Sequence, residues 1–441
     1  GLQYMGDPLY PAKGKKLDVD SWFHLAPRLG LAWDVGGDGR TTIRSAYGLF
    51  YDLPPMYHWG GNHPPYGNQV ILDNVPGGLD QPWLGYPGGS PIPTPIGPNA
   101  PFGEQVTFIN YGQHLSSAYV HQWNLSLQRQ VGANWMVAAN YIGNSTVHGQ
   151  SAVEGNPVIY LPGASCAIAG ISYTPCSTLA NANQRRELYL ANPAQGKYFT
   201  NIQHFGDEST ASYNGMLLSV QSRRSNGLTV QANYTWSHCI SDPIGVGGNS
   251  TTRLLVYPGR RRDERAGCTG DTRHGFNSSI VYETPQFSGS ALRMLATGWQ
   301  LSSIVRIQSG NYFTVVTGFN NALRSGIGTN RADQILDDPY VSDKNVNGWL
   351  NRAAFVRPAD GFWGSASQNI EGPGAITINA GLTRSFHVTE KQSVQFRAEA
   401  FNLPNHMNPG NPINAINNQN FGKIFSAKDP RIMQVALKYI F

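Results

Sequence analysis

Long hydrophobic runs are missing from this 441-residue sequence. No stretch of about 18 apolar residues occurs, which excludes a protein that crosses a membrane with helices. Charge is also scarce, at 13% of residues, against about 25% in ordinary soluble domains. The net charge of +5 is small and dispersed, and it excludes nucleic acid as a partner. Strong helix formers are few, whereas 50 glycines and 11% aromatic residues are present. An all-β protein with long loops remains.

A signal peptide is not visible in the opening residues GLQYMGDPLY, which have neither a basic segment nor an apolar segment. We therefore expect a mature chain or a fragment. The four cysteines fall into two local pairs, Cys166 with Cys176 and Cys239 with Cys268. Neither pair has metal-site spacing, so no metal is expected. We predict two small disulfides in an oxidising compartment, with four free thiols as the alternative.

Apolar and polar residues alternate with a period of two along the whole chain. Near the end, Met433, Val435 and Leu437 share one face, whereas Gln434 and Lys438 share the other. The pattern predicts eleven antiparallel strands, each with one apolar and one wet face, at about residues 24–35, 41–51, 118–130, 134–143, 211–224, 228–238, 273–284, 298–309, 375–386, 392–403 and 431–441.

Short and long connections alternate between these strands. The odd-numbered strands are followed by short turns rich in Gly and Asn, and the even-numbered ones by roughly 25 to 65 residues. If the strands run up and down, all the long loops lie at one end. Soluble sandwiches, the alternative, rarely carry five long loops. The asymmetry favours a transmembrane β-barrel with short periplasmic turns and long extracellular loops.

The two faces of the predicted sheet receive different roles in a barrel. Aromatic residues near the strand ends of the apolar face fit the interfacial girdles, with packing in a sandwich core as the alternative. The polar face would form a wet lumen wall. Its candidate residues are Arg44, Gln122, Asn124, Gln231, Asn233, Arg306, Arg397 and Glu399.

Catalytic chemistry is not indicated, because no metalloprotease, phosphate-loop, hydrolase or dinucleotide motif occurs. We expect no enzyme and no cofactor. Aromatic residues in the first long loop are more suggestive, since aromatic faces beside amides bind sugar rings or apolar peptides. The alternative is that they pack this loop against its neighbours. These candidate ligand-binding residues are Tyr57, Trp59, Tyr66, Trp83 and Tyr86.

Several motifs resemble a known family, the Oar-like TonB-dependent receptors of acidobacterial type. Tyr439 and Phe441 also resemble the terminal aromatic signal by which the barrel-assembly machinery recognises outer-membrane barrels. The motifs that carry the family resemblance are APRLGLAWD at 26–34, AYGLFYD at 46–52, QWNLSLQR at 122–129, ANYTWS at 232–237, DTRHGF at 271–276, GWQLS at 298–302, RAEAFNL at 397–403, FGKI at 421–424 and DPRIMQ at 429–434.

The resemblance implies a barrel of twenty-two strands with an internal plug, a TonB box and an amino-terminal regulatory domain. None of these additional parts is visible, so we expect residues 1–441 to form the carboxy-terminal part of such a barrel, with a small closed barrel made of these strands alone as the alternative. The implied function is binding or import of an unidentified solute at the outer membrane, with the TonB complex, lipid and lipopolysaccharide as partners. The alternative function is a surface adhesin or structural barrel that binds glycans or partners without transport.

Overall fold

The computed structural model describes residues 24–52, 77–84, 89–90, 106–111, 115–225, 227–242, 264–268, 270–320, 323, 330–364, 369–390 and 392–441. One large sheet dominates, and its strands pair in chain order. The strands along its path are β1 (Arg28–Asp34), β2 (Thr41–Tyr51), β4 (Tyr119–Val131), β5 (Trp135–Glu154), β8 (Phe199–Ser225), β9 (Leu228–Ser241), β11 (His274–Glu283), β12 (Trp299–Gln308), β19 (Ala375–His387), β20 (Ser393–Phe401) and β21 (Ile432–Ile440).

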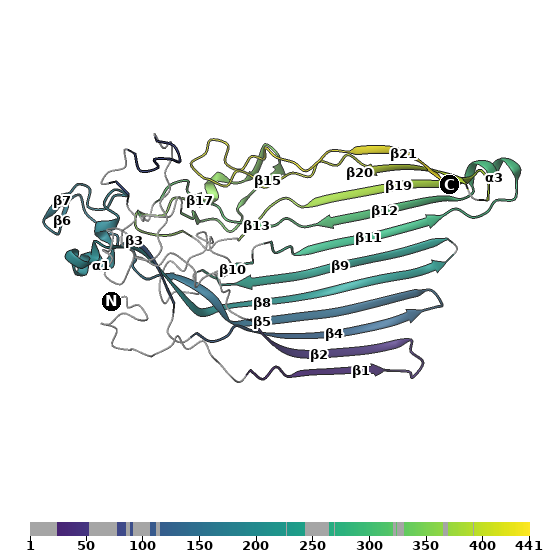
Figure 1. The fold of residues 1–441 in the computed structure, drawn as a ribbon, viewed down its shortest axis with the longest axis horizontal. Coiled ribbons are helices and arrows are strands. Elements are labelled where there is room, and N and C mark those ends of the chain that lie inside the picture. The colour runs from purple at the N-terminus through teal and green to yellow at the C-terminus, as the bar shows by residue number, and fades with distance from the viewer. Residues whose placement is uncertain are drawn as a thin grey trace.

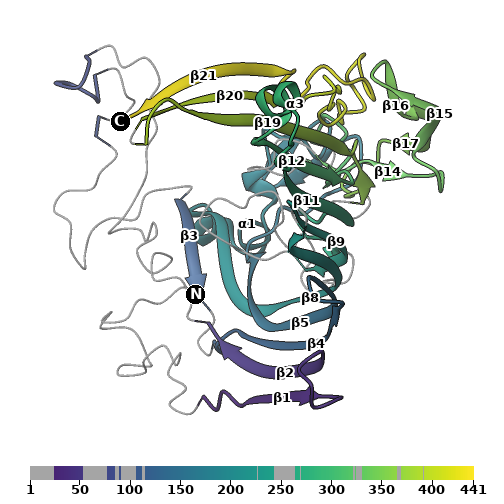
Figure 2. The ribbon, with the colours of Figure 1, turned by 90° about the vertical axis from the view of Figure 1, so that its right-hand side faces the viewer.

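All eleven predicted strands are confirmed, and each pairs antiparallel with its neighbours along the path. The sheet bends into an open trough with β1 and β21 at its two edges (Figure 2). The short turns gather at the end where the chain terminates, and the long connections gather at the other (Figure 1). Gly37 and Gly132 have positive φ values of 69° and 61°, the conformation that tight turns between right-twisted strands require.

Two strands extend well beyond the predicted limits. β5 has 20 residues and β8 has 27, and they continue as a pair past Gly149 and Ser209, where the register shifts. β8 also pairs parallel with β3 (Val106–Tyr111), a strand that the alternation did not predict. β10 (Ala266–Gly267) pairs with the end of β9. The sheet therefore continues into the region of the long connections.

The turn between β11 and β12 holds a helix, α3 (Ser290–Ala296), which the alternation did not predict. Two more short helices, α1 (Glu187–Ala191) and α2 (Pro193–Gly196), lie between β5 and β8. Within the described residues, no helix is long and apolar enough to cross a membrane.

The long connections form a folded layer at one end of the sheet. Its core is a cluster of buried side chains in which Val315, Leu350, Phe355, Ile370 and Ile416 pack together. The layer contains four small pairs of strands: β6 (Cys166–Ile168) with β7 (Ile171–Tyr173), β13 (Tyr312–Phe313) with β18 (Ile370–Glu371), β14 (Asp333–Gln334) with β17 (Phe355–Val356), and β15 (Tyr340–Asn345) with β16 (Gly348–Leu350). Because these connections share a buried core, they hold a fixed shape at this end of the sheet.

Candidate functional site

The polar face of the large sheet brings together the eight residues proposed for a lumen wall. Directly opposite residues in a sheet point to the same side, so the register can be followed from strand to strand. Arg44 lies opposite Ser126, two residues from Asn124. Asn277 lies opposite both Asn233 and Arg306. Continuing through β19 and β20 in the same way places Arg397 and Glu399 on this face as well.

Hydrogen bonds and one ion pair connect parts of this polar face. Asn277 donates a hydrogen bond to Asn233 at 3.4 Å. Arg397 lies 3.8 Å from Glu399, and Gln434 donates a hydrogen bond to the same carboxylate. Arg44, Arg306 and Arg397 outnumber Glu399 among the eight residues. Among these eight residues the polar face therefore carries an excess of positive charge.

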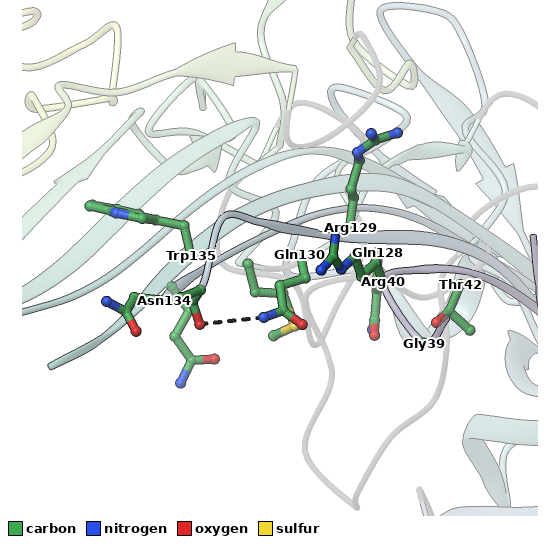
Figure 3. A pocket seen from close by; sticks show the side chains of 11 residues that line it. Gly39, Arg40, Thr42, Gln128, Arg129, Gln130, Asn134 and Trp135 are labelled. Carbon is green, nitrogen blue, oxygen red and sulfur yellow. Dashed lines mark hydrogen bonds between the residues drawn. The ribbon is translucent and has the colours of Figure 1, made fainter. Parts of the chain in front are cut away.

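A pocket of about 140 Å³ lies at the short-turn end (Figure 3). Thr42, Gln128, Gln130, Met136 and Gln221 line it, and the register places all five on the polar face. Gln130 donates hydrogen bonds to the carbonyl oxygens of Gly132 and Ala133 at 3.3 Å. Glutamine and threonine give the pocket both donors and acceptors, and Arg40 and Arg129, which also line it, add positive charge. Such a lining suits a polar group from another segment or solute.

The opposite face of the sheet is apolar and open. Leu29 on β1 is 71% exposed, and Leu437 on β21 is 73% exposed. Leu125, Tyr141 and Met216 continue this face across β4, β5 and β8, where they lie directly opposite one another. A soluble protein rarely exposes an apolar surface of this extent. The face is suited to contact with lipid acyl chains.

Buried carboxylates tie the long connections to the strand ends. Asp242, at the end of β9, accepts two hydrogen bonds from Thr210 and lies 3.3 Å from Arg265. Glu264 is 2% exposed and forms a two-point contact with Arg331, which lies 67 residues away. Because both partners sit in a poorly hydrated environment, removing either one leaves an uncompensated charge. Both carboxylates are engaged in contacts that tie the loop layer to the strand ends.

A second group of charges surrounds the start of β11. Asp271 is 3.3 Å from His238, and Arg273 donates a hydrogen bond to the same imidazole at 2.7 Å. Arg273 also donates to the Tyr312 hydroxyl at 3.3 Å. Burial raises the pKa of Tyr312 above its ordinary value, and the nearby Arg273 opposes that shift. Each group has a protein partner, so this cluster too is structural.

The loop between β5 and β8 contains two buried arginines that the sequence did not indicate. The Arg185 side chain donates to Asn181 and to the carbonyl oxygens of Ile159, Thr178 and Leu323. Burial lowers the pKa of Arg186, and the attraction of Glu154 at 3.8 Å opposes this. Neither arginine stands in a sequence pattern that distinguishes this buried role from an exposed one.

The other predicted residues are placed as follows. Both disulfides are confirmed, with Cα–Cα distances of 5.1 Å for Cys166–Cys176 and 5.3 Å for Cys239–Cys268. Trp83 is half-buried in a short turn at residues 77–84. Tyr439 and Phe441 stack with ring centroids 5.8 Å apart. Four predicted loop aromatics lie outside the described residues: Tyr57, Trp59, Tyr66 and Tyr86.

A metal site is not found: the described ranges contain no group of three or more His, Cys, Asp or Glu side chains that could hold an ion. The candidate site consists of the polar sheet face and the folded loop layer.

Comparison with known families agrees with this geometry. A family described as "Outer membrane beta barrel domain" matches residues 1–434, so the chain belongs to this family. It is an outer-membrane protein, and its sheet is an antiparallel β-barrel sheet. No curated protein matches the sequence.

Solved structures align with this chain at low sequence identity. The outer membrane transporter YddB from Escherichia coli aligns with a TM-score of 0.47 and 10% identity, over 93% of this chain and 40% of that one. A variant of the ferric enterobactin receptor PfeA from Pseudomonas aeruginosa gives 0.42 and 11%, over 94% and 40%. FpvA of P. aeruginosa, bound to heterologous pyoverdines, gives 0.41 and 10%, over 94% and 32%. The chain thus spans 40% or less of each of these proteins.

Proposed function

We propose that this chain is the carboxy-terminal barrel portion of an Oar-like TonB-dependent receptor that imports an anionic solute. The observation that carries the proposal is the polar sheet face, along which Arg44, Arg306 and Arg397 are arranged opposite a lipid-facing surface. A hydrated wall of this length suits a wide barrel with an aqueous interior, since narrow barrels fill their lumen with side chains. Its excess positive charge raises the local concentration of anions.

The two edges of the sheet support the proposal that this chain forms only part of a barrel. β1 and β21 end the pairing path, and no described strand covers the outer edge of either. Unpaired backbone groups in hydrocarbon cost several kcal/mol each. We therefore propose that further strands of a longer protein complete the barrel, to about twenty-two in all. A plug inside that barrel would contact the polar face, including the pocket of Figure 3.

Uptake by cells that carry the full-length receptor tests the function. Mass spectrometry of spent medium would identify anionic solutes that disappear only when both the receptor and TonB are present. Replacing Arg306 and Arg397 with glutamine is expected to slow that uptake roughly tenfold, because steering of the anion toward the wall is weakened. The control is Arg293→Gln, since Arg293 is exposed on helix α3 and lies outside the polar face and the pocket.

Two results would contradict the proposal. Uptake that persists without TonB would show that transport does not depend on energy supplied through TonB. If deleting the receptor leaves the solutes in the medium unchanged but abolishes cell attachment, the protein is an adhesin, which is the alternative function. In that case the loop layer, rather than the polar face, would hold the binding site.

The last residues are proposed as the signal for the barrel-assembly machinery. Tyr439 and Phe441 lie on one face of the final segment and are 54% and 89% exposed, so a partner can reach them. We expect Phe441→Ala to reduce the heat-modifiable, folded protein in outer membranes by about tenfold, because the exposed ring supplies most of the contact area. Lys438→Ala, on the polar face of the same strand, serves as the control. Equal yields of folded protein for both variants would show that the assembly machinery does not recognise the Phe441 ring.

A further inference from the structure

Helix α3 exposes an apolar face at the short-turn end of the sheet. Met294 and Leu295 are each 68% exposed, and Ala291 is exposed beside them. Residues three and four apart share a helix face, so these three form one stripe. Arg293 lies on the other side of the helix, in its last turn. The helix is therefore amphipathic, and its apolar side has no covering element among the described residues.

Two side chains from the apolar face of the sheet hold this helix in place. The indole N–H of Trp299 donates to the carbonyl oxygen of Leu295 at 2.7 Å. Arg384 donates to the same oxygen at 3.3 Å. The register places Trp299 and Arg384 directly opposite each other on β12 and β19, on the lipid-facing side. The helix thus continues the lipid-facing surface rather than the polar wall.

The surroundings of this contact have the composition of a membrane–water interface. The Arg384 guanidinium lies over the rings of Trp299 and Phe386, at 5.4 Å and 4.6 Å. Phe396 packs edge-on against Trp299 at 6.1 Å. Indole rings with a neighbouring cation are enriched where acyl chains meet headgroups, because one end of each group is apolar and the other is hydrated.

We propose that α3 is an interfacial anchor that lies in the periplasmic leaflet of the outer membrane. Ala291, Met294 and Leu295 face the acyl chains, while Arg293 and Arg384 bind headgroup phosphates. Continuity with the lipid-facing sheet and the matching of cations to anionic phosphates both select phospholipid as the occupant. A helix of two turns is marginal in water, and a lipid surface supplies the apolar contact that it needs.

A fluorescent label at Met294→Cys in the full-length protein tests the depth of the helix. The four native cysteines are all in disulfides, so only the new thiol reacts without reductant. The protein is placed in nanodiscs of phosphatidylcholine and phosphatidylglycerol, with or without bromine near the headgroup end of one acyl chain. We expect bromine to lower the emission about twofold, because an interfacial helix inserts to the depth of the first methylenes.

The matched control is the same label at Glu390→Cys, an exposed position in the short turn between β19 and β20. Bromine should leave its emission unchanged. Equal emission at Met294→Cys with and without bromine would overturn the proposal, and so would equal quenching at both positions. Blocking of the label only when the protein self-associates would also overturn it, in favour of a second copy as the occupant.

The charge of the lipid provides an independent readout. Quenching at Met294→Cys should increase with the fraction of phosphatidylglycerol, because Arg293 and Arg384 favour anionic headgroups. Adding Arg293→Gln should weaken that dependence while leaving the barrel folded, since Arg293 is exposed. A response to phosphatidylglycerol that is identical with and without Arg293 would contradict the proposed role of this cation.

Discussion

Replacing Arg185 with methionine is expected to destabilise the loop between β5 and β8 by about 3–5 kcal/mol. The side chain is fully buried and holds three separate segments together. Its donors satisfy carbonyl oxygens of Ile159, Thr178 and Leu323 as well as the Asn181 amide oxygen. Methionine fills a similar length but leaves these four acceptors without their present donor. Buried acceptors without donors cost about 1–3 kcal/mol each.

Limited proteolysis and hydrogen exchange on the full-length protein measure this effect. We expect residues 155–198 to lose protection while the paired strands keep theirs, because the large sheet does not depend on this side chain. Arg40→Met is the matched control. Its ion pair with Asp38 is 3.7 Å long and mostly exposed, so it contributes at most about 1 kcal/mol. Unchanged protection of residues 155–198 would mean that the disulfide Cys166–Cys176 alone maintains the loop.

The strands were predictable because each has one apolar and one polar side, as expected of a barrel strand between lipid and water. That environment imposes a period of two, as in Met433, Val435 and Leu437, and a slip of one residue would reverse the whole pattern. Gly and Asn in the short turns then fixed the strand ends. The same alternation identified the polar face, including Arg306 and Arg397. What these residues do in a complete barrel stays a prediction.

Outside the membrane both faces of a strand contact protein or water. Apolar and polar residues therefore have no physical reason to alternate there. The extensions of β5 and β8 were missed for this reason, as was β3, which pairs with a strand about 90 residues later. Arg185 was missed because its burial depends on Leu323, 138 residues away. Helix α3 has only seven residues, too few for a recognisable helical period. Contacts between distant segments, rather than local sequence, define the loop layer.

Replacing Val305 with arginine is expected to destabilise the barrel by about 2–4 kcal/mol. Val305 lies near the middle of β12, directly opposite Ser278 on β11 and Ile378 on β19. This side of the sheet meets lipid, where an arginine must either bring water with it or stretch to the interface. Urea unfolding of the full-length protein in phospholipid vesicles measures the loss as a lower midpoint with an unchanged slope.

The neighbouring residue provides a closely matched control. Ile304 is also an aliphatic residue of β12, but its side chain points to the polar face, opposite Ser279 and Asn379. It is 53% exposed, and Arg306 already occupies the same face two residues further on. Ile304→Arg should therefore change stability by no more than about 0.5 kcal/mol. Equal losses for the two variants would mean that both faces are dry, and the hydrated wall on which solute passage depends would have to be abandoned.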